Sequence, residues 1–132
     1  NRRSGYYDLG LCGPMRQDAI AKQRQYCGYF KTPTLRNVAT RSVFFHNGVF
    51  RSLEDVVRFY VERETRPEHW YARSSDGKLL RYDDLLRAAH ANVDLIDPPF
   101  DRKRGDAPAL NEDEIRDVAA FLKTLTDGYK PQ

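Results

Sequence analysis

The run from Phe30 to Tyr60 constrains the fold of this chain more than any other part of the sequence. Its first half is rich in turn-forming residues, and it contains Asn47–Gly48, a dipeptide that readily takes up positive φ. Ser52 then offers an N-cap, and Asp55 follows three positions later, as in a capping box with Asp in place of Glu. The run therefore predicts a turn-rich platform, a tight turn and an amphipathic helix.

Apolar residues in this helix recur at the spacing of a single helix face. They are Leu53, Val56, Val57, Tyr60 and Val61. Tyr60 differs from the others because its hydroxyl needs a partner wherever the ring is buried. One interpretation is a core tyrosine whose hydroxyl reaches a backbone carbonyl. The other is a phenolate bound to ferric haem, since tyrosine is an established haem ligand.

A second capped helix is predicted near the end of the chain. Asn111 is its N-cap, Glu114 completes the capping box, and Gly128 is well placed to end it. Its expected buried stripe consists of Ile115, Val118, Ala119, Leu122 and Leu125. Shorter helices are predicted over residues 18–25 and 84–92, with irregular segments between. The sequence thus predicts an all-α fold with long ordered loops.

The composition is typical of one soluble domain, with 132 residues, a formal net charge of +3 and 40% hydrophobic residues. No apolar stretch approaches the roughly 20 residues that span a bilayer, so no membrane span is expected. Basic residues are interleaved with acidic ones, which argues against nucleic acid as a partner. Cys12 and Cys27 favour a disulfide and an oxidising compartment, with two unrelated buried thiols as the alternative.

Several polar and aromatic residues are candidates for a cofactor pocket. Lys31 and Arg36 flank a rigid turn, where they would either pair with haem propionates or remain surface charges. His46 lies beside the tight turn and would either line a pocket or fix the loop through its neighbours. Trp70 lies in an irregular segment, where it would anchor a long loop, cover a pocket or relay electrons.

Four stretches together resemble one known family, and the similarity extends from Gly10 to Tyr129. They are Lys31–Val38, Phe45–Gly48, Leu53–Val57 and Ala120–Thr126. The chain resembles the C-terminal part of the second haem domain in the bacterial dihaem cytochrome c peroxidase/MauG family. The resemblance implies an all-α, cytochrome c-like haem domain.

In that family the distal ligand of the C-terminal haem comes from the helix after the tight turn. Other peroxidases of the family place Met there and MauG places Tyr, and the matching position here is Tyr60. The resemblance therefore implies a MauG-like branch, with Tyr60 as axial ligand of the haem iron. It also implies that Lys31, Arg36 and His46 belong to the haem pocket. Asn47 departs from the family, in which Asp is commoner at this position.

The resemblance further implies a candidate calcium site. Family members hold calcium between their haems, partly through two backbone carbonyls ahead of the tight turn. By position these carbonyls belong to Arg41 and Val43. The usual Thr and Pro are absent here, but backbone oxygens do not depend on the identity of the side chain.

No C-x-x-C-H motif occurs in the sequence, so the chain cannot attach a c-type haem by itself. We therefore expect residues 1–132 to be the C-terminal portion of a longer periplasmic protein. Two haem c groups would be attached through upstream C-x-x-C-H motifs. The implied activity is that of a peroxidase that uses hydrogen peroxide. Its substrate would be either peroxide alone or a second protein, which would be a redox partner or a substrate protein. The haem of Tyr60 would store or relay oxidising equivalents in electron transfer.

A different class of function also fits the residues. The same scaffold without haem would be an all-α binding or interaction module, whose charge of +3 would steer it towards an acidic partner.

Overall fold

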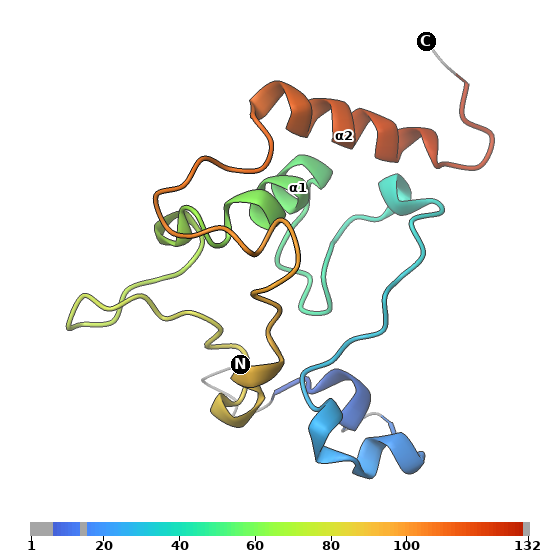
Figure 1. Ribbon diagram of the computed structural model, residues 1–132. Helices are drawn as coiled ribbons and strands as arrows, with labels where there is room; N and C mark the ends of the chain where they lie inside the picture. Colours follow the sequence, from blue (N-terminus) through green and yellow to red (C-terminus); the bar gives the residue numbers. More distant parts are fainter. Residues whose placement is uncertain (1–6, 14–15, 131–132) are drawn as a thin grey trace. The chain divides into compact units, whose positions relative to one another are not determined.

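The computed structural model describes residues 7–13 and 16–130, which contain two α-helices and several short 3₁₀ helices (Figure 1). The α-helices are α1 (Leu53–Glu62) and α2 (Glu112–Thr124). The 3₁₀ helices are η1 (Gly10–Cys12), η2 (Ala19–Lys22), η3 (Arg24–Tyr26), η4 (Val38–Thr40), η5 (Pro67–His69) and η6 (Arg87–Asn92). In the described residues β-pairing is limited to the isolated bridges Phe44–Phe50 and Arg73–Leu79. The predicted all-α class is confirmed.

The chain divides into two compact units, each built from two separate stretches of sequence. The first unit combines the segment up to Thr32 with Tyr71–Leu95. The second combines Pro33–Trp70 with the segment from Ile96 onwards. Both α-helices belong to the second unit, which also contains most of the predicted site residues.

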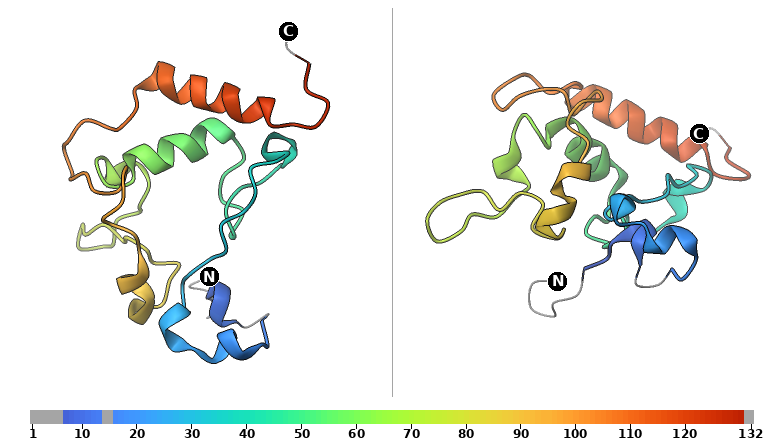
Figure 2. Two further views of the ribbon diagram at one scale, coloured as in Figure 1. Left: turned by 45° about the vertical axis from the view of Figure 1, so that its right-hand side comes forward. Right: turned by 60° about the horizontal axis from the view of Figure 1, so that its bottom comes forward.

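The second unit is built on α1 and α2, which lie side by side (Figures 1 and 2). Val57 and Val61 of α1 pack with Ile115 of α2, and all three are buried. A neighbouring cluster of buried residues joins η4 and the loop over residues 44–50 to the two helices. Its members are Val38, Phe44, Leu53 and Ala119. The apolar stripes of the two helices thus form the core, as their spacing predicted.

Both predicted N-caps are present. The Ser52 Oγ accepts a hydrogen bond from the backbone N–H of Asp55 at 3.3 Å. Asn111 Oδ1 accepts from the N–H groups of Asp113 and Glu114, and Glu114 Oε2 accepts from the N–H of Asn111 at 2.7 Å. The capping box of α2 is therefore complete, whereas in α1 only the serine half of the box is formed.

The predicted end of α2 at Gly128 is wrong. The helix ends at Thr124, because the Thr124 hydroxyl donates to the carbonyl of Phe121 at 2.7 Å. A continuing helix would offer that carbonyl to the N–H of Leu125, which instead donates to Leu122. A threonine side chain that competes with the backbone in this way favours the end of a helix.

The first unit contains short 3₁₀ turns where helices were predicted. The expected helix over residues 18–25 is interrupted at Gln23, whose extended backbone separates η2 from η3. The expected helix over residues 84–92 is instead η6, which begins only at Arg87 because Leu86 is also extended. Segments this short gain too little from α-helical hydrogen bonds to offset the cost of nucleation.

A disulfide joins Cys12 to Cys27 in the first unit, as the sequence favoured. Backbone and side-chain hydrogen bonds support it. The N–H of Leu11 donates to Tyr29 O at 2.9 Å, and Asn92 Nδ2 donates to Cys27 O at 2.7 Å. The cross-link therefore lies in a segment whose backbone is also held by the second stretch of the unit.

Among the described residues, no helix is both long enough and apolar enough to cross a lipid bilayer.

Candidate functional site

Tyr60 lies near the end of α1 and is 44% exposed. The apolar spacing predicted that Tyr60 lies on the buried face of the helix, and this prediction is wrong. Leu53, Val57 and Val61 are buried at steps of four residues, whereas Tyr60 precedes Val61 by one residue. One residue corresponds to about 100° around a helix, which turns Tyr60 to the edge of the apolar face.

The body of the Tyr60 side chain packs against other aromatic rings. Its ring centroid lies 5.7 Å from that of Phe45, 6.4 Å from Phe59 and 5.6 Å from Phe100. Within the described residues its hydroxyl makes no hydrogen bond, so the alternative of a core tyrosine bonded to a carbonyl is not observed. The rings of Phe45, Phe50, Phe59 and Phe100 are called the aromatic wall below. Tyr60 therefore presents its phenol oxygen beside this wall.

Phe45 is the central ring of this wall, although it is not among the site residues predicted from the sequence. Its ring contacts Phe50, Phe59 and Tyr60, with centroid distances of 5.2, 5.5 and 5.7 Å. Its backbone has φ +63°, which is unusual for a bulky residue and commonly marks functional sites. A sequence signal existed in the aromatic pair that directly precedes His46.

The tight turn explains why Phe45 takes this conformation. Phe44 N–H donates to Phe50 O at 2.9 Å, which closes a loop over residues 44–50. Within that loop Gly48 N–H donates to Phe45 O at 3.2 Å. Positive φ was predicted at Asn47–Gly48, but the positive-φ residues of the loop are Phe45 and Gly48. The loop therefore turns twice, and the first turn directs Phe45 against Tyr60.

We predict that Phe45→Ala will lower the free energy of unfolding by about 2 kcal/mol, because a half-buried ring is lost. Phe45→Gly should cost less than Phe45→Ala, since glycine adopts positive φ without strain. Urea denaturation of both variants measures the order. The control is Phe59, which lies inside α1, where Gly should be worse than Ala by about 1 kcal/mol. If Gly were more destabilising than Ala at both positions, the backbone of Phe45 would not be strained.

The other predicted pocket residues have different environments. His46 is exposed and directly follows Phe45, so its loop lies against Tyr60. Arg36 forms a two-pronged ion pair with Asp127, in which Nε–Oδ1 and Nη2–Oδ2 are both 3.0 Å. This pairing, with Asn37, holds the pKa of Asp127 below its usual range. Lys31 is exposed and belongs to the first unit.

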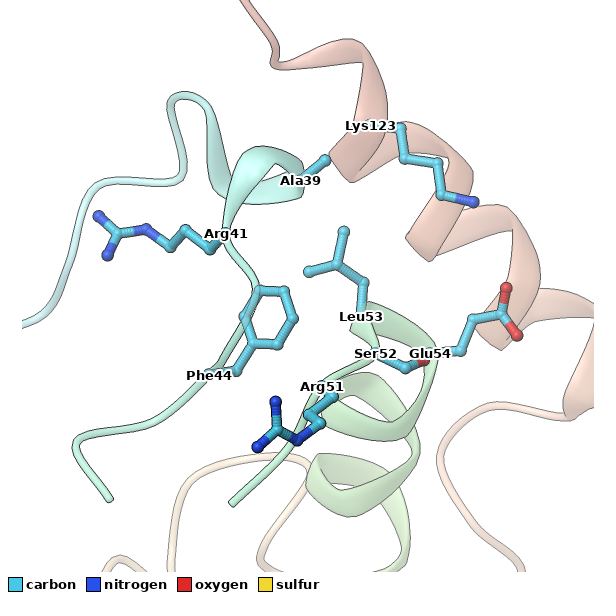
Figure 3. A pocket seen from close by; sticks show the side chains of 8 residues that line it. All are labelled: Ala39, Arg41, Phe44, Arg51, Ser52, Leu53, Glu54 and Lys123. Atoms are coloured by element: carbon cyan, nitrogen blue, oxygen red, sulfur yellow. The ribbon is translucent and has the colours of Figure 1, made fainter. Parts of the chain in front are cut away.

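The region of the predicted calcium ligands contains a hollow of about 340 Å³ (Figure 3). It is lined by Ala39, Arg41, Phe44, Arg51, Ser52, Leu53, Glu54 and Lys123. Phe44 and Leu53 point towards one another there, while the Arg41 side chain extends away from them (Figure 3).

This hollow has an excess of positive charge, because three basic side chains line it and Glu54 is its sole carboxylate. Calcium prefers oxygen ligands, with carboxylates among them. The described residues contain no group of three or more His, Cys, Asp or Glu side chains arranged to hold a metal. The surroundings of Arg41 therefore do not fit a calcium site by themselves.

The chain that follows Tyr60 is held by a buried carboxylate. Glu62 is 3% exposed, and it accepts from Arg66 Nη1 at 2.8 Å and approaches His69 Nδ1 at 3.3 Å. Arg63 lies over the ring of Phe100, with its guanidinium carbon 3.7 Å from the centroid. These contacts fix the end of α1 and the position of Phe100 beside Tyr60.

The surroundings of Tyr60 fit the haem that the sequence implies. A phenol oxygen is the type of ligand that ferric haem accepts, and here it belongs to a residue that is 44% exposed and makes no hydrogen bond to the described residues. Aromatic rings flank it, as a flat apolar group requires. Val43 and Val49 are also exposed on either side of the tight turn.

Comparison with known proteins points to one group. No protein-family model matches the chain. MauG of Paracoccus denitrificans (strain Pd 1222), a methylamine utilization protein, is 30% identical over 105 residues, which are 79% of this chain and 24% of MauG. Cytochrome-c peroxidase IdrP1 of Pseudomonas sp. (strain SCT) is 44% identical over 63 residues, 42% of this chain and 17% of that protein.

Crystal structures of the dihaem peroxidase BthA from Burkholderia thailandensis E264 are also similar. One has a TM-score of 0.79 and 42% identity over 96% of this chain and 30% of BthA. A variant with one tyrosine replaced by methionine has a TM-score of 0.80 and 41% identity, over 97% of this chain and 29% of the variant. The fold is therefore that of these cytochrome c-like proteins, and the chain spans less than a third of their length.

Proposed function

Because the chain belongs to the bacterial dihaem cytochrome c peroxidase/MauG family, we propose that it acts as part of a periplasmic oxidoreductase that uses hydrogen peroxide. The chain would be the C-terminal portion of that protein. The two haem c groups would be attached to an upstream segment, which is the first partner of this chain. A redox partner or substrate protein would be the second. The Cys12–Cys27 disulfide supports an oxidising compartment such as the periplasm.

The role proposed for this chain is to provide the distal ligand of the six-coordinate haem. The observation that carries this role is the exposed Tyr60 hydroxyl, which stands on an aromatic wall without a hydrogen bond to the described residues. When bound, the haem supplies one-electron chemistry and stores or relays oxidising equivalents. Tyr60 would bind the iron as an anionic phenolate, which favours the ferric and higher states.

The neighbours of Tyr60 would orient this ligand. Phe45 and Phe100 contact its ring from two segments and limit its rotation about the side-chain bonds. Because the hydroxyl is exposed, its proton can leave directly to water when the oxygen binds iron. The aromatic rings would then exclude water from one side of the bound oxygen.

The remaining pocket residues keep the roles implied by the resemblance. His46 would line the haem pocket from the loop that contacts Tyr60, and Lys31 would pair with a propionate. Arg36 would do the same only by exchanging its ion pair with Asp127 for a propionate. Calcium at the carbonyls of Arg41 and Val43 would need carboxylates from another segment, given the basic side chains of that hollow.

We predict that Tyr60→Phe will change the ligation of one ferric haem when the chain is produced together with its haem-bearing segment. Phenylalanine retains the ring contacts and removes only the oxygen that binds iron. The electronic absorption and electron paramagnetic resonance spectra of the ferric protein measure this change. The control is Tyr129→Phe, because Tyr129 is 47% exposed and belongs to the same unit. Identical spectra for wild type and Tyr60→Phe would rule out the ligand role.

A further inference from the structure

Five aromatic side chains of the second unit, Tyr60 and Trp70 included, form a continuous array that joins these two residues. Through Phe59 the path has two steps, with centroid distances of 5.4 Å from Trp70 to Phe59 and 6.4 Å from Phe59 to Tyr60. A second path runs through Phe50 and Phe45, with distances of 5.7, 5.2 and 5.7 Å. All of these distances are typical of aromatic rings in contact. Two series of ring contacts therefore connect Tyr60 with Trp70.

Trp70 is the only tryptophan of the chain, and its indole nitrogen is unusual. Nε1 is buried and has no hydrogen-bond partner among the described residues. An indole N–H can only donate a hydrogen bond, so a buried one without an acceptor has nowhere to release its proton. If Trp70 loses an electron, the resulting radical cation therefore keeps this proton. A protonated indole radical is a stronger oxidant than the neutral radical.

Tyr60 has the opposite environment at the other end of the array. Its ring belongs to the array, but the residue is 44% exposed, from which we infer that its hydroxyl reaches water. Loss of an electron makes a phenol strongly acidic, so the proton of Tyr60 can leave to solvent at once. Tyr60 can thus lose both an electron and a proton, whereas Trp70 can lose only an electron. An electron will therefore move from Tyr60 to an oxidised Trp70.

We propose that, where no iron is bound to its oxygen, Tyr60 forms one redox couple with Trp70, in which Tyr60 replaces an electron that a one-electron oxidising radical has removed from Trp70. The electron crosses the rings of Phe59, or of Phe45 and Phe50, and restores the neutral indole with its N–H intact. The hydroxyl proton of Tyr60 passes to water, which leaves a neutral tyrosyl radical. The oxidant gains one electron, and no covalent bond other than the O–H bond is broken. The step uses only side chains of this chain.

Pulse radiolysis of the full 132-residue chain in azide solution tests this couple, because azidyl radicals oxidise tryptophan. In the wild-type chain the absorbance of the tryptophan radical should decay while that of a tyrosyl radical grows at the same rate. The rate should not depend on protein concentration, because the transfer is intramolecular. In Tyr60→Phe the tyrosyl growth should be lost and the tryptophan radical should live longer.

Tyr71→Phe is the matched control, because Tyr71 directly follows Trp70 in the sequence. This variant should keep the wild-type rate and yield. Full tyrosyl growth in Tyr60→Phe, or its loss in Tyr71→Phe, would overturn the proposal. So would the absence of any tyrosyl growth in the wild-type chain. The chain contains no haem in this experiment, so a negative result leaves the proposed ligand role of Tyr60 unaffected.

The rings between the two residues are tested by replacing Phe45 and Phe59 together with leucine. Removing one ring from each path should slow the transfer several-fold. A double variant with the wild-type circular dichroism spectrum and the wild-type rate would show that the array is not the path. If the double variant does not fold, Tyr60→Phe still decides the proposal, because it removes a single oxygen atom.

Discussion

Replacing Ile115 with alanine is expected to lower the free energy of unfolding by about 4 kcal/mol, because this substitution leaves a cavity in the core. Ile115 is 1% exposed and packs against Val57 and Val61 of α1. A loss of this size is a large fraction of the stability of an ordinary domain. It should also affect the site, since α1 carries Tyr60 and is held in place by α2. Urea denaturation followed by circular dichroism measures the change.

The matched control for this prediction is Ile96→Ala. Ile96 is 84% exposed, so the same change in side chain removes little buried surface. Its cost should stay within about 0.5 kcal/mol. If Ile115→Ala and Ile96→Ala had similar effects, the packing of α1 against α2 described above would be wrong.

Replacing Arg66 with alanine is expected to cost about 3 kcal/mol, because it removes the closest partner of a buried carboxylate. The side chain of Glu62 is 4% exposed, and its ion pair with Arg66 measures 2.8 Å. After the substitution, His69 would be the remaining partner of Glu62 among the described residues, with its Nδ1 3.3 Å from Oε2. A charge buried with so little compensation destabilises the folded state strongly. Chemical denaturation at neutral pH measures the cost.

Arg36→Ala is the comparison for this second prediction. Arg36 also forms a close ion pair, but the side chains of Arg36 and Asp127 are 72% and 58% exposed. Water can solvate both charges when the pair is broken, so the cost should be about 0.2–1 kcal/mol. An equal loss at Arg36 and Arg66 would mean that the burial of Glu62 has no energetic consequence.

The parts of the fold that depend on local chemistry were predictable from the sequence. Ser52 and Asn111 supply N-cap oxygens directly before apolar stripes, and both α-helices begin where these caps are. Residues 18–25 and 84–92 were less predictable, because in short segments tertiary contacts decide between α-helix and 3₁₀ turns. Asn92, for example, is tied to the carbonyl of Cys27, 65 positions earlier in the chain.

The candidate site was only partly predictable, for a related reason. Tyr60 could be identified from its position in the helix, but its exposure depends on which residues of α1 face α2. The positive φ of Phe45 results from the closure of the loop between Phe44 and Phe50. The pairing of Arg36 with Asp127 joins residues 91 positions apart, and no sequence pattern indicates it.

The aromatic array between Tyr60 and Trp70 was not predictable at all. Its rings come from the loop over residues 44–50, from α1 and from the segment after η5. Each aromatic residue is ordinary as a sequence feature, and only the fold brings them into contact. The buried Nε1 of Trp70 is likewise a property of the folded chain, because the segment around Trp70 is irregular and charged in sequence.

The most direct test of the central claim is a crystal structure of the protein with its haem groups bound. The Oη of Tyr60 is expected to lie within bonding distance of one haem iron. Phe45 and Phe100 should still contact the Tyr60 ring, as they do in this structure. An iron whose distal position is filled by a different side chain, with the Tyr60 oxygen remote from it, would contradict the account.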